Sequence, residues 1–184
     1  PPFNAWEAGG MEYETFFTTV GGNSFPFDAE NVTRYVTVHE FGHGYFMGLL
    51  ASNEFEEPFL DEGVNELWDA RMLASDPIRF RMPSLARWLG LKLPDVGFWE
   101  MERLTGTARH MADPIAGSSW HRWSSASYGL VYARTALVFH DLEQVLGTPL
   151  FEKAMRLYYD LWHFRHPSTA DLRQAFVDAG ADRA

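Results

Sequence analysis

Two histidines and two glutamates within a short part of the chain have the types and spacing of a catalytic zinc site. The segment 39–43 reads HEFGH, and Glu62 follows it after eighteen intervening residues. In an α-helix, residues four positions apart lie on the same face, so the imidazoles of His39 and His43 can bind one metal ion. Glu62 can supply an oxygen ligand from a neighbouring segment. The sequence therefore predicts a metal site from these residues alone.

The number and kind of these ligands indicate zinc. A catalytic zinc ion takes three protein ligands and keeps a fourth position for water, and two histidines with one glutamate are a known ligand set. We therefore predict Zn²⁺ as the cofactor, bound by His39, His43 and Glu62. Glu40 is predicted to take a proton from the activated water and to hand it to the leaving amine. Glu66, one helical turn after Glu62, is predicted to accept the free ring N–H of a zinc histidine.

HExxH alone is not specific, because it also occurs on ordinary exposed helices. In this chain, further residues after HEFGH add to the signal. The position of Glu62 after HEFGH, and the pattern Glu-Gly-x-x-Glu over 62–66, resemble the gluzincin pattern of the aminopeptidase N family of zinc metallopeptidases. The resemblance implies a thermolysin-like zincin fold. It also implies hydrolysis of the peptide bond next to a free amino terminus.

A segment upstream of the zinc motif agrees with this resemblance. The stretch GGMEY at 9–13 is similar to the family's Gly-x-Met-Glu-Asn motif. The resemblance implies that Gly10, Met11 and Glu12 bind substrate: the Glu12 carboxylate would bind the α-amino group, and the backbone would lie along the peptide. Tyr13 departs from this motif, because it stands where the best-known members have Asn.

A downstream segment resembles the family's stretch around its catalytic tyrosine. It reads VYARTAL at 131–137, followed by LE at 142–143 and LG at 146–147. By this match Tyr132 would donate a hydrogen bond to the oxyanion of the tetrahedral intermediate, where one donor can contribute about 3 kcal/mol. Tyr128 is the rival candidate for this role.

The elements that must position these residues are mostly helices. Weak alternation with aromatic and β-branched residues predicts one strand, at a sheet edge, between 9 and 20. Apolar spacing and the Gly and Pro breaks predict five helices, with an irregular stretch at 78–125. The predicted helices span 31–51, 59–74, 125–146, 150–164 and 170–179.

We predict a mainly α fold, α+β in class: a truncated thermolysin-like zincin catalytic domain with a small sheet remnant. A chain of 184 residues with 46% apolar content is long enough for one domain with a substantial core. Residues 1–184 are expected to form a single zinc metallopeptidase core. The resemblance runs from about Gly9 to Phe176, and the family's flanking domains have no counterpart, so this core is expected to be excised from a larger chain.

Composition excludes several kinds of site and partner. The formal charge of −10 argues against a nucleic-acid partner and favours cationic ligands such as peptide amino termini. The chain has no cysteine, so a metal ion must be bound by histidine and carboxylate. No stretch reaches the roughly 20 apolar residues of a membrane span, and the first residues lack a signal-peptide pattern. We expect a soluble protein; neither its compartment, cytoplasmic or extracytoplasmic, nor its oligomeric state is indicated.

Two aspartates at the second predicted helix are not predicted to belong to the metal site. Asp61 and Asp69 flank this helix, and both are expected to be solvated or helix-capping charges.

Three functions are compatible with the sequence. The first is a zinc aminopeptidase acting on peptide substrates. The second is a zinc endopeptidase with the same metal chemistry, which follows if Glu12 does not bind the amino group. The third is a non-catalytic zinc-binding fragment that lacks the domains needed to close a cleft. The sequence does not indicate which substrate residues are preferred.

Overall fold

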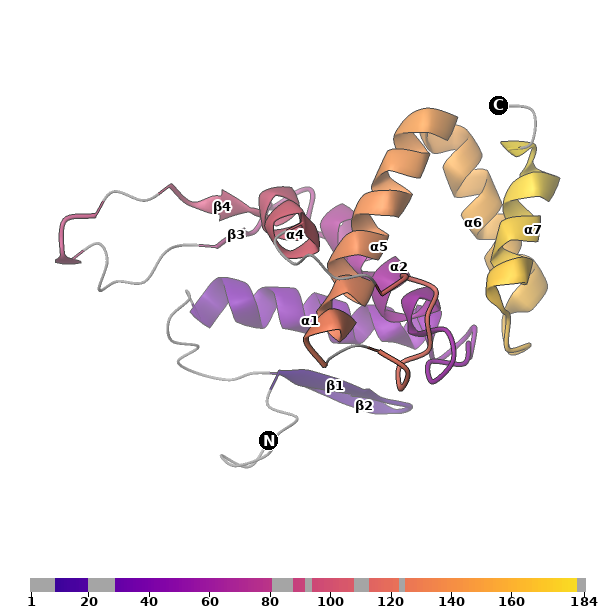
Figure 1. The fold of residues 1–184 in the computed structure, drawn as a ribbon, viewed down its shortest axis with the longest axis horizontal. Helices are drawn as coiled ribbons and strands as arrows, with labels where there is room; N and C mark the ends of the chain where they lie inside the picture. Colours follow the sequence, from indigo (N-terminus) through magenta and orange to yellow (C-terminus); the bar gives the residue numbers. More distant parts are fainter. Residues whose placement is uncertain are drawn as a thin grey trace. The chain divides into compact units, whose positions relative to one another are not determined.

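The computed structural model describes most of the chain and is mainly helical. The described residues are 9–19, 29–80, 88–91, 94–107, 113–122 and 125–181. Helices make up most of them, and each of the two sheets found there has two strands (Figure 1). The predicted mainly α class with a small sheet is therefore confirmed, while the thermolysin-like fold stays a prediction. None of the described helices combines the length and apolar character needed to cross a membrane.

The described residues belong to two compact units, and each unit draws on two separate stretches of the chain. The first unit lies within Pro1–Gly44 and Trp68–Met101. The second lies within Tyr45–Leu67 and Glu102–Ala184. The single catalytic core over residues 1–184 stays a prediction.

The first unit begins with a β-hairpin where the sequence predicted one edge strand. Strand β1 (Gly10–Tyr13) pairs antiparallel with β2 (Phe16–Thr19), and a turn at 14–15 joins them. The prediction of one strand is therefore wrong. The sequence did not indicate the hairpin because this turn lacks the glycine or asparagine that marks most two-residue hairpin turns. The rings of Tyr13 and Phe16 stack at 4.7 Å between centroids, which adds a cross-strand contact.

Helix α1 (Ala29–Phe46) carries the HEFGH motif. It was predicted to run to residue 51, but it ends five residues earlier in a turn in which the backbone N–H of Leu50 donates to the carbonyl of Tyr45. Ala51 then adopts a φ of +57°, which cannot continue a right-handed helix. The predicted end is therefore wrong, while the part that bears the motif is helical as expected.

Two side chains tie α1 to a distant segment of the same unit. Arg34 forms an ion pair with Asp76 at 2.7 Å, and the Asn31 amide donates to the carbonyl oxygen of Arg79 at 3.0 Å. The first contact is to a side chain and the second is to the backbone. Residues 76–79 therefore help to position α1 through both their side chains and their main chain.

The second predicted helix is two elements. A short 3₁₀ helix, η1 (Pro58–Leu60), is followed by α2 (Glu62–Met72). Pro58 starts η1, as expected for a residue that has no N–H to lose at a helix start. Glu62 therefore lies in the first turn of α2, as predicted.

The stretch 78–125 was expected to be irregular, but it contains regular elements. Strand β3 (Arg79–Phe80) pairs antiparallel with β4 (Val96–Gly97), and helix α4 spans Phe98–Thr107. Gly97 just before this helix and Gly106 inside it obscured the helix in the sequence, since glycine is typical of breaks and an interior glycine costs a helix about 1 kcal/mol relative to alanine. Gly106 has a packing reason, because a Cβ there would come within 3.0 Å of a side chain of the long helix that follows.

The second unit ends in three consecutive helices, whose prediction is confirmed to within two residues at each end. They are α5 (Ser125–Leu146), α6 (Thr148–Trp162) and α7 (Thr169–Ala179). Gly147 joins α5 to α6 with a φ of +80°, a conformation that favours glycine. The chain therefore reverses between these helices within very few residues.

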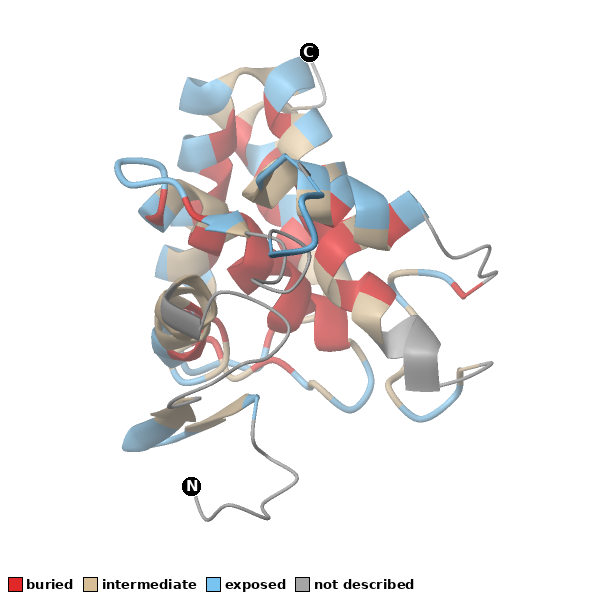
Figure 2. Ribbon diagram, turned by 90° about the vertical axis from the view of Figure 1, so that its left-hand side faces the viewer, coloured by how far each residue is buried: buried red, intermediate tan, exposed pale blue. Residues whose placement is uncertain are grey.

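Aromatic rings fill the core of these three helices. Phe151 of α6 packs edge-on against Phe139 of α5 and Phe176 of α7, at 6.4 and 5.5 Å between ring centroids. All three side chains are buried, and Figure 2 shows buried residues along the facing sides of the helices. The high aromatic content thus serves core packing here.

A contact within the second unit joins the start of α7 to the loop before η1. The backbone N–H of Thr169 donates to the Glu57 carboxylate at 3.2 Å, and the Thr169 hydroxyl donates to the same group. Ser168 and Asp171 form a capping box at this helix start. Because Glu57 immediately precedes η1, the start of α7 fixes the segment that leads into Glu62.

Candidate metal centre

The two histidines of HEFGH lie together on α1, in the first unit. His39 and His43 are 6% and 2% exposed, and their Nε2 atoms are 3.1 Å apart. Two nitrogen ligands at about 2.0–2.1 Å from a tetrahedral zinc ion lie about 3.3 Å apart. The separation of the two Nε2 atoms therefore fits two imidazoles that share one ion.

A buried aspartate fixes the first of these rings. His39 Nδ1 donates to the Asp69 carboxylate at 2.6 Å, and Asp69 is fully buried. A proton held on Nδ1 leaves the Nε2 lone pair for a metal ion, which is the usual role of a carboxylate behind a zinc histidine. The expectation that Asp69 is a solvated or capping charge is therefore wrong.

The sequence assigned this supporting role to Glu66. Glu66 is also buried, but at His39 the carboxylate that accepts the ring N–H belongs to Asp69. A sequence signal for Asp69 existed: it lies seven residues after Glu62, which is two helical turns and hence the same face of α2. The role predicted for Glu66 at a histidine stays a prediction.

Glu40, the predicted base, is buried against the β-hairpin. A Cβ at Gly10 would overlap the Glu40 carboxylate and the Val36 side chain, and Gly10 has a φ of +149°. Thr19 and Thr37 make a second contact between the hairpin and α1, with their hydroxyl oxygens 3.3 Å apart. Gly10, the second glycine of the Gly-Gly pair, therefore allows the close approach of β1 to the motif helix.

Glu12 lies on the face of β1 that is turned to α1. Side chains alternate between the two faces of a strand, so Glu12 shares its face with Gly10 and Met11 points from the other face. Ligand atoms of Glu12, Glu40 and His43 lie within 4.8 Å of one another. The structure thus places the residue predicted to bind an amino group beside the predicted base.

The second unit brings together two further predicted site residues. The Tyr132 hydroxyl of α5 donates a hydrogen bond to the Glu62 carboxylate. Gly63 makes this possible, because a Cβ there would overlap the Thr135 side chain and the Val131 carbonyl oxygen on α5. The Glu-Gly pair therefore allows α2 and α5 to approach closely. The side chain of the rival Tyr128 lies outside the described part of the chain.

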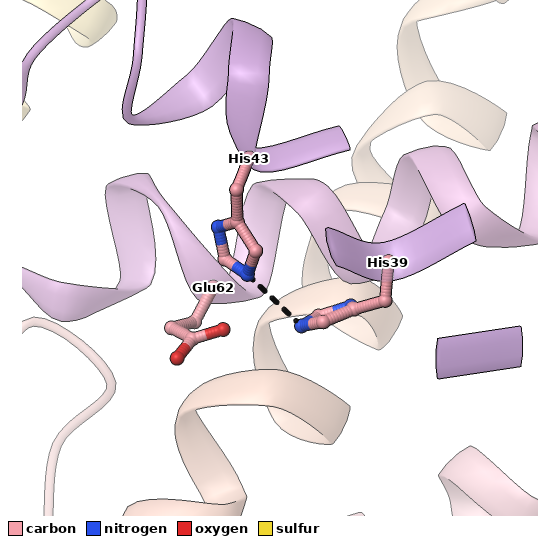
Figure 3. Close-up of side chains that lie close together, drawn as sticks. All are labelled: His39, His43 and Glu62. Carbon is pink, nitrogen blue, oxygen red and sulfur yellow. Dashed lines mark hydrogen bonds between the residues drawn. The ribbon is translucent and has the colours of Figure 1, made fainter. Parts of the chain in front are cut away.

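The described chain contains a buried group that could hold a metal ion. One ligand atom each of His39, His43 and Glu62 lies within 4.8 Å of the other two, and all three residues are buried. Figure 3 shows the Glu62 carboxylate close to the two rings. Two imidazole nitrogens and one carboxylate oxygen are a zinc-type donor set.

Neither the comparison with protein-family models nor that with curated proteins finds a match to this chain. The resemblance to the aminopeptidase N family therefore rests on the motifs quoted above.

The hydrogen bond from His39 predicts that Asp69 contributes to metal affinity. We expect Asp69→Asn to weaken zinc binding by about 10- to 100-fold, because the ring loses its fixed orientation and basicity. Competition with a chromogenic chelator measures the affinity, and circular dichroism checks the fold. Asp178→Asn is the control, since Asp178 is exposed and lies on α7, outside the unit that contains the two histidines. Equal zinc affinity in the two variants would contradict the role of Asp69.

The close approach at Gly63 predicts that a single methyl group destabilises the protein. Gly63→Ala should lower the free energy of unfolding by about 1–3 kcal/mol through overpacking against α5. Gly129→Ala is the matched control, because among the described residues nothing lies within 4 Å of a Cβ built there. That substitution should be neutral or stabilising, since alanine favours a helix. Denaturant unfolding measures the free energy of unfolding of both variants. Equal values for the two would contradict the close contact at Gly63.

Proposed function

We propose that this chain is a zinc-dependent aminopeptidase that hydrolyses the peptide bond next to a free amino terminus. The observation that carries the proposal is the buried group of His39, His43 and Glu62, with its Nε2 atoms at a separation suited to one ion. The motifs that resemble the aminopeptidase N family, in the order of that family, add the reaction class and a thermolysin-like catalytic core. Zn²⁺ is the metal that this donor set favours.

The side chains around this group have distinct tasks in such a reaction. A bound zinc ion would lower the pKa of its water to about 7 and polarise the substrate carbonyl. Glu40 accepts the proton of the attacking water and then transfers it to the leaving amine. The Tyr132 hydroxyl, which has one proton, would exchange its hydrogen bond to Glu62 for one to the oxyanion that forms when water adds to the carbonyl. Asp69 keeps His39 in the tautomer whose Nε2 has a free lone pair.

The hairpin supplies the substrate contacts. Glu12 binds the substrate's α-ammonium group by a charge-assisted hydrogen bond. Within the described residues β1 pairs only with β2, so its other edge can accept an extended peptide by β-strand addition. Gly10 and Met11 would provide the backbone groups for that pairing. A formal charge of −10 favours the approach of a cationic amino terminus.

A chelation experiment with a base variant tests the zinc mechanism. The wild-type protein should hydrolyse fluorogenic amino-acid amides, lose activity with a chelator and regain it with Zn²⁺. Glu40→Gln should keep its zinc by metal analysis yet lose about 10²- to 10⁴-fold in kcat, because the proton acceptor is gone. Activity that survives chelation would contradict the proposal. So would a Glu40→Gln variant with full activity.

A blocked substrate tests whether Glu12 makes the enzyme an aminopeptidase. We expect the wild-type protein to cleave a peptide with a free amino terminus and to reject its N-acetylated form. Glu12→Gln should lower kcat/KM for the free peptide by about 10- to 100-fold, since a hydrogen bond to a charged group contributes about 1.5–3 kcal/mol. Glu14→Gln, in the exposed hairpin turn, is the control and should have no effect. Equal cleavage of the acetylated peptide would indicate an endopeptidase instead.

A further inference from the structure

We propose that Phe17 forms an apolar wall for the side chain of the substrate's first residue, so that the enzyme prefers large apolar amino-terminal residues. The inference rests on the proposed aminopeptidase function and adds its substrate class. It follows from the register of the hairpin, the contacts that orient it on α1, and the exposure of its aromatic rings.

Two contacts determine which face of the hairpin is turned to α1. Gly10 lies directly against Glu40 and Val36, and Thr19 approaches Thr37 with hydroxyl oxygens 3.3 Å apart. Gly10 and Thr19 are opposite each other in the register of the two strands. Directly paired residues of an antiparallel sheet share a face, so both contacts identify the same face.

Phe17 occupies that face next to Glu12. The register pairs Glu12 with Phe17, two residues along each strand from the pair Gly10 and Thr19. Side chains alternate with a period of two, so Glu12 and Phe17 also point towards α1, with Cβ atoms about 4.5–5.5 Å apart. Glu12 in turn has a carboxylate oxygen within 4.8 Å of ligand atoms of Glu40 and His43. Phe17 is therefore the immediate neighbour of the group proposed to bind the α-ammonium.

The ring of Phe17 is available for a ligand. Its side chain is 38% exposed, and none of the described hairpin residues is buried (Figure 2). The neighbouring Phe16 differs: it points from the opposite face, where it stacks on Tyr13. The two adjacent phenylalanines thus have different surroundings although they have the same chemistry.

The chemistry of this pair of side chains defines the substrate class. A carboxylate beside an aromatic ring offers one charged contact and one apolar surface, which matches an α-ammonium group and the side chain on the same carbon atom. Leucine, methionine and phenylalanine side chains can cover the ring, whereas alanine leaves most of it in water. One methylene group more or less in an apolar pocket changes kcat/KM by about 10- to 200-fold.

Matched substitutions of the two phenylalanines test the inference on a panel of alanine, leucine, methionine, phenylalanine and lysine amides. The wild-type enzyme should prefer the large apolar residues over alanine. Phe17→Ala should lower kcat/KM for the leucine and phenylalanine amides by about tenfold and leave the alanine amide nearly unchanged, so that the preference narrows. Phe16→Ala should keep the wild-type profile. Phe17→Val, a strand-forming residue of intermediate size, should give an intermediate profile if the alanine variant does not fold.

The outcomes separate the inference from the proposed function. A wild-type enzyme that prefers alanine or lysine, or Phe16 and Phe17 variants with the same profile, would overturn the role of Phe17 while leaving the aminopeptidase intact. A zinc-loaded wild-type protein that cleaves no amide of the panel would instead overturn the proposed function itself.

Discussion

The hydrogen bond from His39 to Asp69 is the interaction on which the candidate metal centre most directly depends. It joins α1 to α2 inside the first unit through two buried side chains at 2.6 Å. A buried carboxylate is costly unless it is paired, and a buried imidazole has two tautomers unless one nitrogen is claimed. The same bond meets both demands. Because the Nδ1 proton of His39 is donated to Asp69, the lone pair of the ring is on Nε2. This is the atom that lies beside Nε2 of His43.

Glycine provides the second constraint, at two separate places. Gly10 lets β1 approach Glu40, and Gly63 lets α2 approach α5 so that Tyr132 reaches Glu62. In both cases a side-chain carbon would overlap a neighbouring group. Packing therefore explains Gly63, which follows Glu62, and Gly10, which precedes Met11 and Glu12 in the hairpin.

The sequence predicted those parts of the site that depend on local geometry. The four-residue spacing of His39 and His43 determines that they share a helix face, whatever surrounds the helix. Helices α5, α6 and α7 were predicted because their apolar spacing is regular and glycine or proline lies at their ends. These features belong to single segments of the chain.

Features that depend on contacts between segments were missed. Asp69 could be placed on the face of Glu62, but its partnership with His39 depends on how α1 and α2 cross. The hairpin turn at 14–15 has no residue typical of such turns, and its strands are held by the packing of Gly10 and Thr19 on α1. Glycines obscured α4 for the same reason, since Gly106 serves a tertiary contact.

The bond between Glu57 and Thr169 has a consequence for the order in which the chain acquires its structure. These residues are 112 positions apart, and Glu57 precedes the short 3₁₀ helix that leads to Glu62. A nascent chain emerges with its amino-terminal end first, and contacts across long sequence separations form late. The histidine pair, by contrast, needs only one helix. During synthesis a fixed position for Glu62 therefore comes later than the histidine pair, because it requires Thr169 to have emerged.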